Sequence, residues 1–278
     1  MHAVELHIKQ ALTGIYPESE IKGFTKIIFT EVFHFNMLDY YMGKDINLSA
    51  NEAEQLDEIL ARLQKNEPIQ YILGYTEFYG MTFCVTPAVL IPRPETAELV
   101  SLIIKENVDC SAKILDIGAG SGCIAISLAK NLPQAKVSSW DVSDEALKVA
   151  RENNEKLGAS VTFSKVDVLE YKPFGEKFDV IVSNPPYITN AEKADMENNV
   201  LDWEPSLALF VPDEDPLLFY RKIAELGLDM LTPGGKIYFE INQAFGKETA
   251  DLLLSLGYCD AKIIKDLSGR DRIVKALR

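Results

Sequence analysis

The segment from residue 113 to residue 131 constrains the fold more than any other part of the chain. Its beginning, Lys113–Ile117, is mostly apolar and predicts a short buried strand. The strand leads into the glycine-rich run 118–122, and the apolar stretch from Cys123 to about Asn131 predicts a helix. Glycines between a strand and a helix let the backbone approach a ligand closely. The segment therefore predicts part of an α/β sheet with a ligand at the turn.

A second predicted strand, Lys136–Asp141, ends in an acid at the spacing where a carboxylate meets ribose hydroxyls. The turn differs from the dinucleotide pattern G-x-G-x-x-G because position 123 is Cys. No P-loop lysine follows the glycines, so phosphate binding is not indicated. The pattern favours an adenosine-type ligand, although a glycine-rich turn alone is often only a turn.

Strand and helix signals alternate through the rest of the chain. Ser143 is expected to cap a helix to about Leu157, and further helices are expected at about 95–107, 216–231 and 246–256. The remaining strands are expected at 161–166, 178–182, 236–241, 259–266 and 272–277, with turns at 233–235 and 268–269. Right-handed βαβ connections make the first five of these seven strands parallel, and the final hairpin adds an antiparallel strand. This order is typical of a Rossmann-like class I S-adenosylmethionine-dependent methyltransferase rather than a nicotinamide enzyme.

The fourth strand runs into Ser183-Asn184-Pro185-Pro186-Tyr187. Proline cannot donate to a sheet ladder, so two in succession end the strand. The residue before a proline is extended, which places Asn184 at the carboxyl end of a strand, where open α/β sheets bind ligands. A strand that simply stops at a Pro-Pro turn, with Asn184 as a turn residue, is the alternative.

Two other segments flank the same predicted edge. The third strand ends at Asp167-Val168, where an acid commonly meets an adenine amino group, and a plain loop acid is equally consistent. After the fourth strand, residues 188–215 predict an irregular polar loop that serves as a lid or a partner surface.

Charge and histidine placement restrict the chemistry. The formal net charge is −14 without a visible Lys/Arg cluster, which argues against nucleic acid as the main substrate and suits a basic protein partner. All three histidines lie within the first 34 residues, so later residues cannot build a Ser-His-Asp or Cys-His nucleophile or a His/Cys zinc cluster. Four scattered cysteines, no signal peptide and no membrane-length apolar run predict a cytoplasmic protein.

The amino-terminal part predicts a small helical domain. Leu56, Ile59, Leu60 and Leu63 have helical spacing, Ser49 and Glu52 resemble a capping box, and residues 27–35 predict another buried helix. We expect a helical domain at 1–75, a hairpin linker at 76–95 and the α/β domain at 96–278.

Four motifs together resemble one family. They are Ile91–Thr96, Asp116–Gly122, Asn184–Tyr187 and Glu204-Pro205-x-x-Ala208-Leu209. In this combination the chain, from about Glu67 to its end, resembles the PrmC/HemK family of peptide chain release factor N5-glutamine methyltransferases. The resemblance implies S-adenosyl-L-methionine as cofactor, a helical domain that docks a class I release factor, and the glutamine of a Gly-Gly-Gln loop as target.

The motifs and the resemblance together give the expected site. The residues expected to be catalytic are Asn184, Pro185 and Tyr187. Two carbonyl oxygens, on the Asn184 side chain and the Pro185 backbone, are expected to accept the two N–H bonds of the target amide, while Tyr187 packs on it. The cofactor-binding residues are expected to be Asp116, Gly118, Ala119, Gly120, Ser121, Gly122, Asp141, Asp167, Val168 and Asn184. The substrate-binding residues are expected to be Asn184, Pro185, Pro186, Tyr187, Arg93 and Glu95, without a metal.

Two alternatives stay open from the sequence. An adenine-N6 methyltransferase on DNA or RNA shares the Asn-Pro-Pro-Tyr motif but needs a basic groove. A non-catalytic cofactor-binding protein has no need for both motifs. We expect a monomer that acts in translation termination, and the charge argues against direct nucleic-acid binding.

Overall fold

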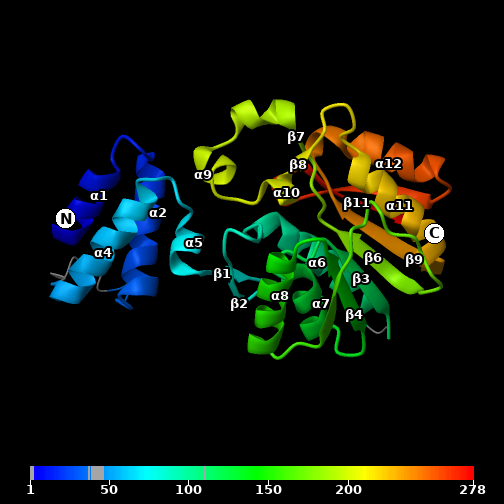
Figure 1. The fold of residues 1–278 in the computed structure, drawn as a ribbon, viewed down its shortest axis with the longest axis horizontal. Helices are drawn as coiled ribbons and strands as arrows, with labels where there is room; N and C mark the ends of the chain where they lie inside the picture. The colour runs from blue at the N-terminus through cyan, green and yellow to red at the C-terminus, as the bar shows by residue number, and fades with distance from the viewer. Residues whose placement is uncertain (1–2, 37, 39–46, 109–110) are drawn as a thin grey trace. The chain divides into compact units, whose positions relative to one another are not determined.

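The computed structural model describes residues 3–36, 38, 47–108 and 111–278 (Figure 1). The chain divides into two compact units. One contains Met1–Leu73 together with Asn198–Trp203, and the other contains Gly74–Glu197 and Glu204–Arg278. Each unit is described separately below.

The first unit is helical. Its helices are α1 (Ala3–Leu12), α2 (Glu18–Ile27), α4 (Ala50–Leu63), α5 (Ile69–Leu73) and α9 (Asn198–Leu201), with a π-helical turn η1 (Ile28–Val32). The apolar faces of the helices before residue 74 enclose a core that includes Ile8, Phe29 and Leu63, whereas α9 has no buried residue. The predicted capping box is confirmed, because the Ser49 side chain accepts the Glu52 N–H while Glu52 accepts the Ser49 N–H.

One predicted helix in this unit is shorter than expected and is a π-helix. Residues 27–35 do not form a separate α-helix: α2 ends at Ile27, a π-turn follows, and the backbone leaves helical geometry after Phe33, with φ of 54° at His34. The Phe33 N–H donates to the Ile28 carbonyl, five residues back, which is the π-helical pattern. Apolar spacing alone does not distinguish this turn from a continuing α-helix.

The second unit contains the predicted seven-stranded sheet, in the order β10-β11-β9-β6-β3-β4-β5. Five strands are parallel, and β11 is antiparallel to both β9 and β10, which confirms the predicted topology. The strands are β3 (Lys113–Ile117), β4 (Lys136–Asp141), β5 (Val161–Lys165), β6 (Phe178–Ser183), β9 (Leu231–Glu240), β10 (Cys259–Lys265) and β11 (Asp271–Leu277). The expected turn at 233–235 lies within β9, at an irregularity in its pairing with β6.

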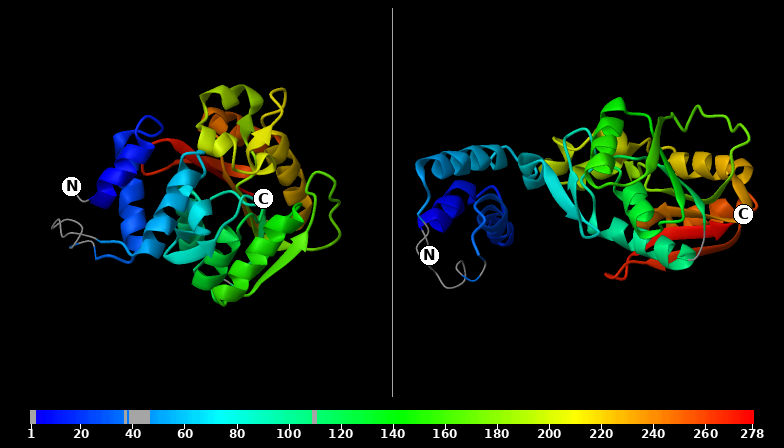
Figure 2. Two further views of the ribbon diagram at one scale, coloured as in Figure 1. Left: turned by 60° about the vertical axis from the view of Figure 1, so that its left-hand side comes forward. Right: turned by 90° about the horizontal axis from the view of Figure 1, so that it is seen from below.

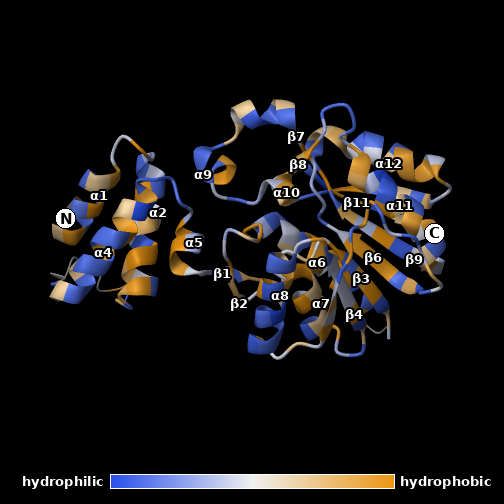
Figure 3. Ribbon diagram, viewed as in Figure 1, coloured by the Kyte–Doolittle hydropathy of each residue, from blue (hydrophilic) through white to orange (hydrophobic). Residues whose placement is uncertain are grey.

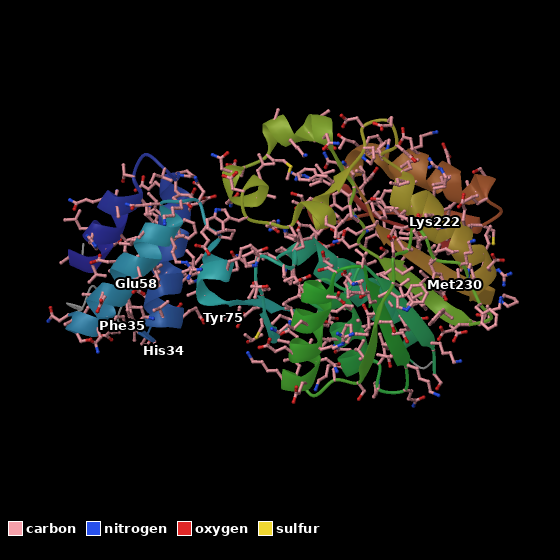
Figure 4. The ribbon with its side chains drawn as sticks, in the orientation of Figure 1. His34, Phe35, Glu58, Tyr75, Lys222 and Met230 are labelled. Atoms are coloured by element: carbon pink, nitrogen blue, oxygen red, sulfur yellow. The ribbon has the colours of Figure 1, made fainter. Side chains whose placement is uncertain are left out.

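Helices cover both faces of this sheet (Figures 1 and 2). Alternate residues of β3 pack in two cores. Ile114 packs with α6 (Pro94–Asn107) and α7 (Cys123–Asn131), whereas Leu115 packs with α11 (Leu218–Met230) and α12 (Gly246–Ser255). The strands β3 and β6 are therefore coloured mostly hydrophobic in Figure 3. Met230, labelled in Figure 4, ends α11 within the second core. The helices are α6 (Pro94–Asn107), α7 (Cys123–Asn131), α8 (Asp144–Lys156), α11 (Leu218–Met230) and α12 (Gly246–Ser255).

A hairpin of β1 (Tyr75–Phe78) and β2 (Met81–Cys84) precedes α6. Its turn residues, Tyr79 and Gly80, both have positive φ, as a tight hairpin turn requires. Asn153 of α8 is fully buried and bonds both the N–H and the carbonyl of Cys84, at 2.7 and 2.9 Å. The same Asn153 amide donates to the Ser121 carbonyl at 2.9 Å, so it joins the hairpin to the glycine turn.

The segment after β6 is more regular than predicted. It contains several short elements. Ile188–Thr189 (β7) pairs in parallel with Phe210–Val211 (β8), and a capping box at Thr189 starts a 3-10 helix. These elements are β7, η2 (Asn190–Asp195), α9, α10 (Ser206–Leu209) and β8, and η3 (Gln243–Phe245) lies before α12. Within the described ranges, no helix is long and apolar enough to cross a membrane.

Candidate active site

A cavity of about 180 Å³ lies at the carboxyl ends of β3, β4 and β6. It contains most of the residues that the sequence singled out. Those that line it are Arg93, Gly118, Ala119, Gly120, Ser121, Asp141, Asp167, Val168, Asn184, Pro185 and Pro186. Glu95, Asp116, Gly122 and Tyr187 are not among the lining residues. The glycine turn and the Asn-Pro-Pro run, more than 60 residues apart in the chain, therefore share one cavity.

The glycine turn is held by the end of β4. The Gly118 and Ala119 N–H groups both donate to the Trp140 carbonyl at 2.9 Å, and the Gly120 N–H donates to Asp141 Oδ2 at 2.9 Å. Gly118, Gly120 and Gly122 all have positive φ, a conformation that side chains disfavour. The glycines are therefore required by the backbone path of the turn.

Gly122→Ala is expected to destabilise the protein by about 2 to 4 kcal/mol and to weaken cofactor binding. The added Cβ would lie 2.9 Å from Ile126 Cδ1 and 3.4 Å from the Ala150 Cβ, at a φ of +81°. Gly158→Ala is the matched control, since Gly158 has positive φ but nothing within 4 Å of an added Cβ. Urea unfolding should show a loss of about 1 to 2 kcal/mol for the control. Equal losses for the two variants would contradict the crowding argument.

Asp141 is held at the end of β4 by two backbone N–H groups. Its Oδ2 accepts from Gly120 and its Oδ1 accepts from the Ser143 N–H, each at 2.9 Å. A carboxylate oxygen can accept more than one hydrogen bond, so both oxygens keep capacity toward the cavity. Trp140, Phe219 and Ile223 also line the cavity and give it apolar walls. Asp167, another acid in the lining, accepts the Leu169 N–H at its Oδ1 at 2.9 Å. Acids beside apolar walls suit a nucleoside.

Asp116 lies beneath the turn and is fully buried. Ser139 donates to its Oδ2 at 2.8 Å, while its Oδ1 is buried without a hydrogen-bond partner among the described residues. Burial, reinforced by the charge of Asp141 and opposed by the Ser139 hydrogen bond, raises the pKa of Asp116 to about 7. The Asp116 side chain is therefore a buried carboxyl group that is bonded to β4 through Ser139.

Asn184 follows the last residue of β6, as the two prolines predict. Ser183 is fully buried and donates to the Ile117 carbonyl at 2.6 Å, which fixes the end of β6 against β3. The half-buried Asn184 side chain extends from this point, with its Nδ2 3.5 Å from Thr96 Oγ1. Pro185 has no N–H. Position 185 therefore supplies a backbone carbonyl beside Asn184 but no backbone donor that could compete for it.

A buried carboxylate beneath this turn was missed by the sequence argument. Glu240 ends β9 and is 1% exposed, and it accepts the Thr96 hydroxyl at 2.7 Å. The Tyr187 hydroxyl lies 3.5 Å from its other oxygen. Burial raises the pKa of Glu240 and also raises the pKa of Tyr187. An acid at the end of a predicted strand was the signal available in the sequence, because all parallel strands end at this edge.

A second buried acid joins two of the motifs. Glu204 is 5% exposed, and its Oε1 lies 2.5 Å from Arg93 Nη2. Its Oε2 accepts the Ile91 N–H at 3.2 Å. Arg93 and the residues after Glu204 line the cavity, so this ion pair holds one wall to the other. Glu95 is half-buried, and its charge contributes to the raised pKa of Glu240.

No group of three metal-ligating side chains occurs in the part of the chain that the structure describes. Three cysteines in that part, Cys84, Cys123 and Cys259, are free thiols, and burial raises the pKa of Cys123 to about 12. Cys110 lies outside the described residues.

Comparison with known proteins identifies the family. Residues 7–74 match the PrmC N-terminal domain model, and residues 95–202 match the methyltransferase small domain model. The chain is 58% identical over all of its length and all of the length of a release factor glutamine methyltransferase of Bacteroides thetaiotaomicron. It is 48% identical to that of Flavobacterium psychrophilum, over 96% of this chain and 95% of the relative.

Solved structures support the fold. A methyltransferase from Pyrococcus furiosus superposes with a TM-score of 0.53 and 22% identity, over 78% of this chain and 96% of that one. That level of likeness concerns the fold alone. With sequence identity along its entire length, the chain belongs to the release factor glutamine methyltransferase family.

Proposed function

We propose that this chain transfers a methyl group from S-adenosyl-L-methionine to the side-chain amide nitrogen, N5, of the glutamine in the Gly-Gly-Gln loop of class I peptide chain release factors. One observation carries the proposal: the Asn184–Pro186 run and the glycine turn line one cavity, in a chain 58% identical to a release factor glutamine methyltransferase. The reaction supports translation termination and takes place in the cytoplasm.

The residues of the cavity fit the cofactor. The positive-φ glycine turn leaves no side chain between the backbone and a ligand, and Asp141 retains acceptor capacity for ribose hydroxyls. We assign Gly118, Ala119, Gly120 and Ser121 to the amino-acid and sulfur end, and Asp167 and Val168 to the adenine. Asp116 and Gly122 support the turn from beneath. When bound, S-adenosylmethionine supplies an electrophilic methyl group on a positively charged sulfur.

The protein's task is to orient a weak nucleophile. An amide lone pair is delocalised into its carbonyl group, so the site must hold the nitrogen with its lone pair toward the methyl group. In our proposal Asn184 Oδ1 and the Pro185 carbonyl each accept one N–H of the target amide. Positioning of this kind can supply much of a rate enhancement. No strong base is required, because the methylated nitrogen loses its proton readily to water.

Tyr187 has a changed role in this proposal. It does not line the cavity, and its hydroxyl points toward buried Glu240. Its N–H donates to the Leu209 carbonyl at 3.2 Å. We therefore assign Tyr187 to holding the Asn184–Pro186 run in place rather than to covering the substrate amide. Arg93 and Glu95 are proposed to contact the protein substrate at the edge of the site.

The remaining assignments concern the domains of the chain, its oligomeric state and its binding of nucleic acid. We propose that residues 1–75 dock the release factor, that 76–95 form the hairpin linker and that 96–278 carry the chemistry. We also propose a monomer without direct nucleic-acid binding, since the net charge of −14 opposes a phosphate backbone. The adenine-N6 alternative gains no support from the relatives, which are named for release factor glutamine.

The test is labelled methyl transfer from S-adenosylmethionine to a purified class I release factor. A Gln→Asn version of its Gly-Gly-Gln loop and duplex DNA are the matched substrates. We expect label on the intact release factor alone. Label on the Asn version at the same level, or on DNA, would overturn the substrate assignment while leaving the fold and cofactor assignments intact.

A further inference from the structure

A chain of three buried or half-buried side chains runs beneath the Asn-Pro-Pro-Tyr motif. The Thr96 hydroxyl donates to Glu240 Oε2 at 2.7 Å, and Asn184 Nδ2 faces Thr96 Oγ1 at 3.5 Å. Thr96 is 2% exposed and Glu240 is 1% exposed, so water does not replace either partner. The three residues come from the start of α6, the end of β9 and the residue after β6, respectively.

The direction of the hydrogen bonds in this chain is fixed at Glu240. In this contact the Thr96 hydroxyl donates and Glu240 Oε2 accepts, so the single hydroxyl hydrogen of Thr96 is committed to the carboxyl group. The Thr96 oxygen therefore presents lone pairs toward Asn184. Only the NH₂ end of the Asn184 amide can approach those lone pairs favourably, so the amide carbonyl Oδ1 is directed the other way.

Glu240 has charged and polar neighbours besides Thr96, and burial, the largest influence on it, raises its pKa. The charge of Glu95 acts in the same direction as burial, whereas the hydrogen bonds of Thr96 and Tyr187 and the positive charge of Arg272 lower the pKa of Glu240. The Tyr187 hydroxyl lies 3.5 Å from Oε1, so one carboxylate lies under both ends of the motif. Asp266 in turn holds Arg272, with 3.3 Å between its Oδ2 and Arg272 Nε.

We propose that Thr96 and Glu240 are positioning residues that set the amide orientation of Asn184. The inference rests on the proposed function and deepens it. In the set orientation Asn184 presents a carbonyl oxygen, which accepts an N–H of the substrate amide. In the flipped orientation it would present an NH₂ group to another NH₂ group, and the target nitrogen would lose its acceptor.

The test compares Thr96→Val with Thr96→Ser. Valine keeps the shape of threonine but cannot accept from Asn184 or donate to Glu240, whereas serine keeps the hydroxyl. We expect Thr96→Val to lower kcat by about 10- to 100-fold, with KM for the release factor and the dissociation constant of S-adenosylmethionine within about threefold of wild type. Thr96→Ser should retain kcat within about threefold.

Thr249→Val controls for the loss of any buried threonine hydroxyl. Thr249 is fully buried in α12 and donates to the Phe245 carbonyl at 2.8 Å, outside the cavity lining. We expect its kcat to equal that of wild type. A Thr96→Val enzyme with wild-type kcat would overturn the proposal, and so would a Thr96→Ser enzyme as slow as Thr96→Val.

A second readout does not depend on the substrate. In ¹⁵N-labelled protein the Asn184 side-chain NH₂ signals, assigned by their loss in Asn184→Asp, should show exchange with water that is at least about tenfold faster in Thr96→Val than in Thr96→Ser. If wild-type protein labels no release factor, the proposed function fails. These signals then still test whether Thr96 sets the orientation of the Asn184 amide. Identical exchange rates of the Asn184 NH₂ protons in the two variants would overturn the proposed role of Thr96.

Discussion

Replacing Asn184 with alanine is expected to lower kcat for methyl transfer to the release factor by roughly a thousandfold or more. The change removes the side-chain carbonyl that we propose accepts one N–H of the substrate amide, and the nitrogen then has a single acceptor, at Pro185. The dissociation constant of S-adenosylmethionine should stay within about fivefold of wild type, because the glycine turn and Asp141 are untouched. Single-turnover kinetics with calorimetric cofactor titration measures both quantities.

Asn190→Ala is the matched control for this variant. Asn190 lies three residues beyond Tyr187 and donates to the Val211 carbonyl at 3.3 Å, outside the cavity lining. It should transfer methyl groups at the wild-type rate. If Asn184→Ala kept even a tenth of wild-type kcat, the side-chain carbonyl would not be the acceptor that orients the substrate.

Asp116→Asn is expected to change how stability depends on pH. The pKa of Asp116 is raised by burial to about 7, against an ordinary value of 3.8. The folded state therefore holds this proton more tightly than the unfolded state, and the wild-type protein loses stability as pH rises through the interval between the two values. Asparagine has no such proton. Between pH 5 and pH 8 the free energy of unfolding of the variant should gain about 2 to 3 kcal/mol on that of wild type.

Urea unfolding of both proteins at four pH values in that range, without cofactor, provides the measurement. Ser139→Ala supplies an independent check, because the Ser139 hydrogen bond lowers the pKa of Asp116 and its loss should extend the falling region to higher pH. A difference between wild type and Asp116→Asn that does not change with pH would show that Asp116 is ionised throughout.

Local sequence rules were enough for the frame of the catalytic unit. The Pro185-Pro186 pair ends β6 at Ser183, and the glycines after Ile117 place a turn where β3 ends. Both rules act within a few residues, so they needed no knowledge of the tertiary structure. Because parallel strands end at one edge, they also brought Asn184 and the glycine turn to one cavity.

What the sequence did not provide are contacts between distant residues. Thr96 and Glu240 are separated by 144 positions, and Arg93 and Glu204 by 111, yet each pair is bonded in the folded protein. The two-residue pairing of β7 with β8 is of the same kind. Such contacts depend on the tertiary fold, which brings residues far apart in the sequence together. Hydrophobic periodicity and capping residues report only on local structure and do not predict them.

The membership of Asn198–Trp203 in the helical unit affects how that unit is made during synthesis. The Trp203 indole N–H donates to the Lys65 carbonyl at 3.1 Å, so the last contributor to the unit leaves the ribosome more than 120 residues after Leu73. The hydrophobic core described for the amino-terminal helices contains no residue of 198–203, so these helices leave the ribosome with that core and gain the Trp203 hydrogen bond only later. A gene fragment that stops near residue 75 encodes the helical unit without residues 198–203. A fragment that starts near residue 75 encodes residues 198–203 without the helices to which they belong.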